Sequence, residues 1–263
     1  MEKFLAPFSQ GSYNGVRINS RLPQRYREHN HMHVPHEFQD WVASEVTSLL
    51  KMGVLKRWDP ASMGAPCPVV VAPLIVEPTK PRLIYDARYI NCFLSLPSVE
   101  MFGTGKIPST CRKGMYLVTL DHKRGYYHVP IHPECWKYFG VSWKGELLCY
   151  VTLTFGWSPS AFIYCTLTGA CSAFTRKITI APVLDWVDDV LTGTSALHKN
   201  LSHTIQFQSA NRTSFTLAMV LYFAGYYINL PKSNLFPLRV VQFLGTQGYA
   251  PSLSFCGSLY KEM

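Results

Sequence analysis

The spacing of apolar residues predicts three helices in this chain. Apolar side chains recur near helical spacing over residues 38–55, and residues 197–224 are expected to be mainly helical and closed by Gly225. A third helix is expected to begin with Ser158 as N-cap and Pro159 at its first position, because both residue types are favoured there. The apolar pattern carries this helix to about residue 173.

Shorter apolar runs bounded by turn-forming residues predict strands at 69–76, 82–85, 115–121, 138–143, 146–152, 178–186, 190–192, 226–230 and 240–244. Pro73 interrupts the first run, which favours a strand at a sheet edge. Residues 77–81 predict one hairpin turn and Lys144-Gly145 another. The order of strands, hairpins and helices predicts an α+β fold, with helices packed against one antiparallel sheet.

The composition is that of a folded, basic protein. Of the 263 residues, 48% are apolar and 16% are charged, which excludes a disordered chain. The formal net charge of +9 favours an anionic partner, with nucleic acid and an acidic membrane surface as the leading candidates.

Three features predict an intracellular protein, cytoplasmic or nuclear, with no membrane partner. The eight cysteines include no Cys-x-x-Cys pair, which indicates reduced thiols rather than a zinc ribbon or disulfides. The first residues lack the pattern of a signal peptide. Two uncharged stretches, 147–175 and 213–231, contain glycine and many polar residues, which favours buried core over membrane spans.

The most informative motif is Trp186-Val187-Asp188-Asp189, in which two adjacent carboxylates lie between apolar runs. A further carboxylate, Asp121, ends another apolar run. Acids placed where burial is expected repel each other and lose hydration, and a divalent cation is the usual reason to keep them. Carboxylates from two strand ends can hold paired Mg²⁺ ions, as polymerases do. The alternative is a solvated acidic turn beside an unrelated strand-end aspartate.

These motifs, in this order, resemble the fingers and palm of a reverse transcriptase over about residues 40–246. The run Leu-Asp-His-Lys-Arg-Gly-Tyr at 120–126 matches the first palm aspartate, and 186–189 is a variant of the Tyr-x-Asp-Asp turn. Segments 80–91 and 155–160 resemble the fingers motif and the start of the long palm helix. The sequence following the first aspartate looks most like long-terminal-repeat and tyrosine-recombinase (DIRS-like) retroelements.

The resemblance implies the fingers and palm of a right-hand polymerase, with an antiparallel palm sheet packed on helices. It divides the chain into a basic N-terminal arm (1–38), fingers (39–112), palm (113–130), a fingers hairpin (131–153), palm again (154–245) and a tail or truncated start of the thumb (246–263). We expect the thumb to be largely absent and primer-template binding to be weak. Thumb and RNase H would belong to another chain or to the parent polyprotein.

The resemblance also implies the groups that hold two Mg²⁺ ions, which Mn²⁺ could replace. Asp121 and Asp188 would bridge both ions, the backbone carbonyl of His122 would add a ligand, and Asp189 would tune the site. Lys232 resembles the late palm lysine that protonates pyrophosphate as a general acid. An ordinary surface lysine is the alternative for Lys232.

A second group of residues would bind the incoming dNTP. Arg82, with Lys80 nearby, would pair with the triphosphate, although a plain surface charge is the alternative for Arg82. Tyr126 would lie under the sugar and exclude a 2′-hydroxyl; its alternative is a core tyrosine. Phe155 would pack near the nucleotide, and Gly156 would allow the backbone to approach nucleotide or template closely.

The remaining candidates would contact template or primer. They are Arg88, Trp157 and Ser158 on the template side, and Trp186, Val187, Phe243, Leu244 and Gly245 on the primer side. For Arg88, as for Asp86 and Asn91, a structural role that holds fingers to palm is favoured, with contact to the template as the alternative. The last three primer-side residues resemble the primer grip, for which a core strand ending in a turn is the alternative.

Together these features predict an RNA-directed DNA polymerase that adds deoxynucleotides to a primer 3′-hydroxyl by two-metal nucleotidyl transfer. Its partners would be an RNA or DNA template, a primer and dNTPs. One alternative is a catalytically weak or domesticated nucleic-acid-binding module that keeps the palm fold. Another is an RNA-directed RNA polymerase, which Tyr126 disfavours.

Overall fold

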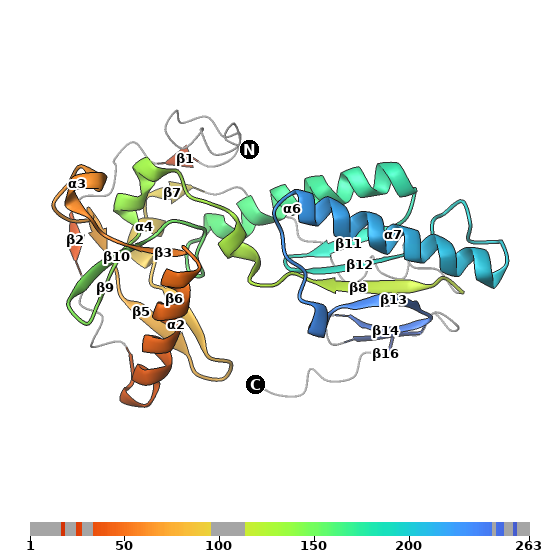
Figure 1. Cartoon of the computed structure of the whole chain (residues 1–263), viewed down its shortest axis with the longest axis horizontal. Helices are drawn as coiled ribbons and strands as arrows, with labels where there is room; N and C mark the ends of the chain where they lie inside the picture. The colour runs from red at the N-terminus through yellow and green to blue at the C-terminus, as the bar shows by residue number, and fades with distance from the viewer. Residues whose placement is uncertain are drawn as a thin grey trace. The chain divides into compact units, whose positions relative to one another are not determined.

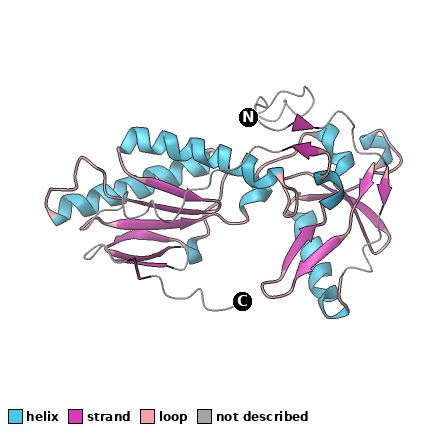
Figure 2. Ribbon diagram, turned by 180° about the vertical axis from the view of Figure 1, so that it is seen from behind, coloured by secondary structure: helices cyan, strands magenta, loops and turns pink. Residues whose placement is uncertain are grey.

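The computed structural model describes residues 17–18, 25–27, 34–95, 114–243, 246–249 and 255–256. Most of the predicted N-terminal arm and tail, together with residues 96–113, lies outside the described residues. The chain forms two compact units, unit 1 from residues 1–98 and 126–162 and unit 2 from residues 99–125 and 163–263. Both units combine helices and sheets (Figures 1 and 2), which confirms the α+β prediction.

Unit 1 contains a five-stranded sheet in the order β2-β4-β9-β10-β3. Its strands are β2 (Tyr26–Arg27), β3 (Leu55–Arg57), β4 (Val70–Val71), β9 (Gly140–Trp143) and β10 (Glu146–Tyr150). The β9–β10 hairpin turns at Lys144-Gly145 as predicted, and both turn residues have positive φ, 49° and 83°. Two pairings, β2 with β4 and β4 with β9, are parallel, so the expectation of one antiparallel sheet is wrong.

The predicted strand at 69–76 is two strands, separated by Pro73. β4 lies inside the five-stranded sheet, so the edge position predicted for this run is wrong. After the proline, β5 (Leu74–Glu77) pairs with β6 (Arg82–Tyr85) in a separate antiparallel hairpin. Proline removes one ladder donor, and the chain uses that position to change from one sheet to another.

The helices of unit 1 are α2 (Gln39–Lys51), α3 (Pro60–Met63) and α4 (Arg88–Asn91), with short 3₁₀ turns η3 (His36–Phe38), η5 (Gly125–His128, which begins in unit 2) and η6 (Pro133–Tyr138). α2 buries Val42, Val46 and Leu49, which share one face as the helical period requires. It ends before the predicted boundary because Gly53 adopts φ +71°, after which the chain enters β3. A short antiparallel pair joins β1 (Arg17–Ile18) and β7 (Leu94–Ser95).

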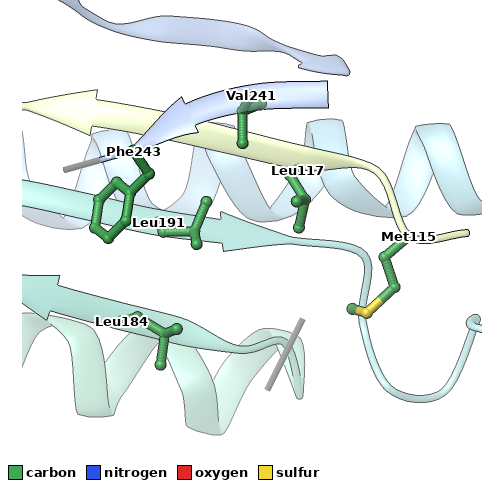
Figure 3. Packing of buried hydrophobic residues seen from close by; sticks show 6 residues of the cluster. All are labelled: Met115, Leu117, Leu184, Leu191, Val241 and Phe243. Atoms are coloured by element: carbon green, nitrogen blue, oxygen red, sulfur yellow. The ribbon is translucent and has the colours of Figure 1, made fainter. Parts of the chain in front are cut away.

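Unit 2 is built on an antiparallel sheet in the order β11-β12-β8-β13. Its strands are β8 (Leu117–Asp121), β11 (Val183–Trp186), β12 (Asp189–Gly193) and β13 (Asn234–Leu238). Two long helices, α6 (Pro159–Thr179, which begins in unit 1) and α7 (His203–Phe223), lie on one face of this sheet (Figure 1). A buried cluster formed by Met115, Leu117, Leu184, Leu191, Val241 and Phe243 joins three strands of the sheet to β14 (Val240–Phe243; Figure 3).

Several boundaries in unit 2 differ from the prediction. α6 continues beyond residue 173 to Thr179, and within this extension the hydroxyls of Thr175 and Thr179 donate to carbonyls four residues earlier. β11 therefore starts later than expected. The strand predicted at 226–230 is wrong: only Ile228 forms a bridge, and η7 (Leu230–Lys232) follows. α7 likewise starts at His203, after a turn, rather than at 197.

The last strands form a small sheet of β14 (Val240–Phe243), β15 (Thr246–Tyr249) and β16 (Phe255–Cys256). Within the described residues, none of the helices has the length and hydropathy needed to cross a bilayer. The cysteines whose side chains are described, at 67, 92, 135, 149, 165 and 171, are free thiols.

Candidate active site

The acidic residues predicted from the two motifs meet at one end of the unit 2 sheet. β12 pairs antiparallel with β8, and in this register Asp189 lies opposite Asp121. Asp188 lies in the two-residue turn between β11 and β12, and its carbonyl accepts a hydrogen bond from His122 N–H (2.8 Å). The sequence had placed both acids in the turn; the structure instead puts Asp189 at the first position of β12.

The turn that carries Asp188 has a strained backbone. Val187 adopts φ +55°, a left-handed conformation that a β-branched residue rarely takes. The thiol of Cys165, on α6, lies within hydrogen-bonding reach of Val187 N–H, and burial raises the pKa of this thiol. The half-buried, neutral thiol of Cys165 on α6 therefore contacts the turn at Val187. Asp188, the next residue of the turn, is exposed.

The acids form a site of concentrated negative charge. Burial, followed by the charges of Asp188 and Asp121, raises the pKa of Asp189 to about 6. Lys232 on η7 is exposed and opposes this shift, so its ammonium lies close enough to act on Asp189. A site with this charge pattern attracts cations.

Sequence reasoning missed the residues that hold Asp121. The Asn229 side chain donates from Nδ2 to Asp121 Oδ1 (2.7 Å), and Asn229 N–H donates to the Asp121 carbonyl (2.8 Å). Ser233 Oγ accepts from Asp121 N–H (2.9 Å). Both residues flank Lys232 in the run Asn-Leu-Pro-Lys-Ser, whose turn-forming composition could have signalled a side chain bonded to backbone.

The donor set fits a hard divalent cation. Among the described residues, no three or more His, Cys, Asp or Glu side chains are grouped so that they alone could hold a metal ion. Mg²⁺ in polymerase sites typically takes one or two carboxylates and completes its shell with water and substrate phosphates. Asp121 and Asp188, from adjoining elements at one sheet end, match that partial set.

His122 can contribute to such a site only through its backbone. Its ring is 2% exposed, its Nδ1 is hydrogen-bonded to the Tyr164 hydroxyl, and it stacks on Tyr226 with ring centres 5.8 Å apart. Gly125 packs on the same tyrosine, since a Cβ there would lie 2.5 Å from the Tyr164 hydroxyl. These contacts fix the chain that leaves β8.

In unit 1 the structure brings together three of the residues predicted to bind the nucleotide. The ring centres of Tyr126 and Phe155 are 4.9 Å apart, and the Arg82 guanidinium carbon lies 5.9 Å from the Phe155 ring centre. Arg82 is exposed at the start of β6, and Lys80 is exposed in the preceding turn. The group therefore offers two cations beside an aromatic pair.

Gly156 is required by a close backbone approach. It adopts φ +98°, and a Cβ at this position would lie 2.0 Å from the Tyr85 carbonyl oxygen. Asn91 secures the same loop, because its Nδ2 donates to the Gly156 carbonyl and its Oδ1 accepts from Ser158 N–H, both at 3.0 Å. Asn91 therefore has a structural role, which is one of the two roles expected for it.

The remaining candidates lie in varied surroundings. Trp157 is buried, with its ring centre 4.9 Å from that of Phe139, whereas Ser158 is exposed. Arg88 forms a forked pair with the buried Asp86 and keeps a largely exposed side chain.

On the primer side, Trp186 and Val187 are half-buried at the end of β11, and Phe243 belongs to the core cluster of unit 2. Leu244 and Gly245 lie outside the described residues. The template and primer roles of all these residues stay predictions.

Comparison with known proteins finds relatives among the Pro-Pol polyproteins of foamy viruses. No family model matches the chain. It is 30% identical over 203 residues to the Pro-Pol polyprotein of feline foamy virus and 26% identical over 200 residues to that of simian foamy virus type 1. These matches cover 77% and 76% of the chain but only 16% of each relative, so the chain spans about a sixth of their length.

Solved structures show the same fold. The native prototype foamy virus protease-reverse transcriptase matches with a TM-score of 0.67 and 20% identity, over 98% of this chain and 33% of that one. The foamy viral protease-reverse transcriptase in complex with an RNA/DNA hybrid matches with a TM-score of 0.60 and 21% identity, over 87% and 27% of the two chains. A third structure, of the same enzyme with double-stranded DNA, matches with a TM-score of 0.66 and 19% identity, over 97% and 43%.

Proposed function

We propose that this chain, a reverse transcriptase domain whose relatives are foamy virus Pro-Pol polyproteins, catalyses RNA-directed addition of deoxynucleotides to a primer 3′-hydroxyl. The observation that carries the proposal is the meeting of Asp121, Asp188 and Asp189 at one end of the unit 2 sheet. A strained turn and a raised carboxyl pKa are features that cluster at functional sites, and both occur here.

In this proposal Asp121 and Asp188 hold the divalent cations, with the His122 carbonyl as a further ligand. When bound, the ions supply Lewis-acid activation of the primer hydroxyl and stabilise the charge of the departing pyrophosphate. Asp189 would add negative charge beside the two ligands, and the positive charge of Lys232 favours the ionised form of Asp189. Lys232 is also the proton donor that we assign to the leaving pyrophosphate.

Unit 1 would supply the groups that select the nucleotide. Arg82 suits bidentate pairing with a phosphate, and Lys80 adds a point charge at the same hairpin. The Tyr126 ring, supported by Phe155, would exclude a 2′-hydroxyl and so favour deoxynucleotides. Gly156 holds the Phe155 loop against β6, which fixes the ring that supports Tyr126.

The proposed nucleic-acid partner is a primer annealed to an RNA or DNA template. The net charge of +9 favours binding to phosphates without sequence preference. Structures of the related foamy viral enzyme contain an RNA/DNA hybrid or double-stranded DNA, which supports this partner for the present chain. Because the chain spans about a sixth of its viral relatives, the proposal is limited to nucleotidyl transfer.

Single-nucleotide extension tests this proposal. A labelled DNA primer on an RNA template is incubated with the chain, Mg²⁺ and one complementary dNTP or its ribonucleotide. The expected result is Mg²⁺-dependent addition of the deoxynucleotide and little addition of the ribonucleotide. Binding of the duplex without any addition would favour the alternative of a nucleic-acid-binding module.

A further inference from the structure

Asn229 belongs to a segment that runs antiparallel to the chain leaving β8. Lys123 N–H donates to the Tyr227 carbonyl (2.8 Å), and Asn229 N–H donates to the Asp121 carbonyl (2.8 Å). Between these bonds His122 and Ile228 form an antiparallel bridge. The segment therefore fixes the backbone of Asp121 at the point where the regular strand ends.

The Asn229 side chain acts on the carboxylate itself. Its Nδ2 is 2.7 Å from Asp121 Oδ1, and this bond joins residues 108 positions apart in the sequence. An aspartate carboxylate has a broad terminal torsion, so a single fixed donor restricts its rotation considerably. An amide is neutral, so it orients the carboxylate and leaves the negative charge that attracts a cation.

The same residue also sets the position of Lys232. The Asn229 carbonyl accepts from Lys232 N–H (3.0 Å) and from Ser233 N–H (2.9 Å), which closes the short helix η7. The Ser233 hydroxyl oxygen in turn accepts a hydrogen bond from Asp121 N–H. The Asn229 side chain thus contacts Asp121 directly. Its backbone positions Lys232, whose charge acts on Asp189.

We propose that Asn229 is a positioning residue of the active site, whose amide holds the Asp121 carboxylate in the orientation that binds a divalent cation. The inference rests on the proposed function, because it assigns the cation to Asp121. Hydrogen-bond partners of ligating carboxylates typically contribute roughly 10-fold to 100-fold in metal affinity. We expect an effect of that size here.

Mn²⁺ binding to the full chain, followed by the loss of the free-ion electron paramagnetic resonance signal, tests this role without requiring catalysis. Asn229→Ala should raise the Mn²⁺ dissociation constant by at least about 10-fold. Ser233→Ala removes a hydrogen bond to the same residue but not to its carboxylate, so it should lower the unfolding temperature and change Mn²⁺ affinity far less. Asn211→Ala, at an exposed position of α7, should have the Mn²⁺ affinity and the unfolding temperature of the wild type.

Two outcomes would overturn the inference. In one, Asn229→Ala binds Mn²⁺ like the wild type while Asp121→Asn loses binding. In the other, Asn229→Ala and Ser233→Ala weaken binding equally, which would mean that the segment merely supports the strand. Equal Mn²⁺ binding by the wild type and Asp121→Asn would instead remove the metal site of the proposed function, and the role of Asn229 with it.

A second substitution keeps the test decisive if Asn229→Ala does not fold. Asn229→Ser retains a turn-forming residue, but its side chain is too short to reach the Asp121 carboxylate. The same loss of Mn²⁺ affinity is expected, with a near-native unfolding temperature. Wild-type affinity in a folded Asn229→Ser variant would contradict the assignment.

Discussion

Asp121 and Asp189 lie directly opposite each other in the antiparallel pair formed by β8 and β12. Partners in such a pair have Cα atoms about 4.5–5.5 Å apart, and like charges placed there destabilise a sheet. A third acid, Asp188, adjoins them at the turn. The fold thus maintains repulsion at one end of the sheet, and a bound cation would relieve it.

The stability of the metal-free protein should depend on pH through Asp189. Its pKa is raised from 3.8 to about 6, so the folded state retains a proton that the unfolded state loses. The resulting stabilisation is complete below pH 3.8 and is lost as the pH rises through 6. Relative to Asp189→Asn, the free energy of unfolding of the wild type should fall by about 1 kcal/mol over that window, allowing for solvent screening.

Urea denaturation in the presence of a chelator measures this difference at several pH values. The Asp189→Asn variant is the matched reference, because it keeps the shape of the side chain and cannot titrate. A stability difference that stays constant from pH 4 to about pH 7 would contradict the raised pKa.

Tyr126 should control the choice of sugar. Removal of its ring in Tyr126→Ala opens space for a 2′-hydroxyl, so ribonucleotide use relative to deoxynucleotide use should rise by at least about 10-fold. Tyr127→Ala is the matched control, since Tyr127 is the neighbouring ring on Phe155, at 6.0 Å between ring centres. The ratio of kcat/KM values for dTTP and UTP measures the effect, and an unchanged ratio in Tyr126→Ala would exclude the gate role.

Arg82 should affect nucleotide binding more than turnover. Loss of a charge-assisted pair with the triphosphate in Arg82→Ala should raise KM for the dNTP by about 10-fold to 100-fold. Arg57→Ala is a suitable control, because Arg57 is an exposed arginine of the same unit paired with the exposed Glu146. Steady-state kinetics with varied dTTP provide the measurement; equal KM values for the two variants would refute the assignment of Arg82.

Gly156 should be far less replaceable than Gly145, although both have positive φ, +98° and +83°. Gly145→Ala meets no neighbouring atom and should cost about 1–2 kcal/mol for the left-handed backbone alone. In Gly156→Ala the new Cβ would also overlap the Tyr85 carbonyl. The total loss in free energy of unfolding should therefore be roughly 2–5 kcal/mol. Chemical denaturation compares them, and equal losses would disprove the close approach.

Local patterns were sufficient to predict the elements that carry the acids. The run ending in Asp121 and the Asp188-Asp189 turn lie at strand ends, and pairing of β8 with β12 brings them together. The Lys144-Gly145 turn was equally predictable, because Gly145 readily accepts the positive φ that a two-residue hairpin turn requires.

Other features depend on contacts that local patterns do not contain. The apolar run at 226–230 predicted a strand, yet Asn229 is held by Asp121, 108 residues away, and a 3₁₀ helix starts at Leu230 instead. β13 was missed because Pro237 lies inside it, and the strand is tolerated at the sheet edge.

The most direct test of the central claim compares two aspartates of one hairpin in dTTP incorporation on poly(rA)/oligo(dT) with Mg²⁺. Asp188 is exposed at the turn, whereas Asp185 is half-buried and bonded to the Ser172 hydroxyl on α6. We predict that Asp188→Asn abolishes incorporation and that Asp185→Asn preserves most of it. Incorporation that survives in Asp188→Asn, or a folded wild type that binds the duplex and incorporates nothing, would contradict the account.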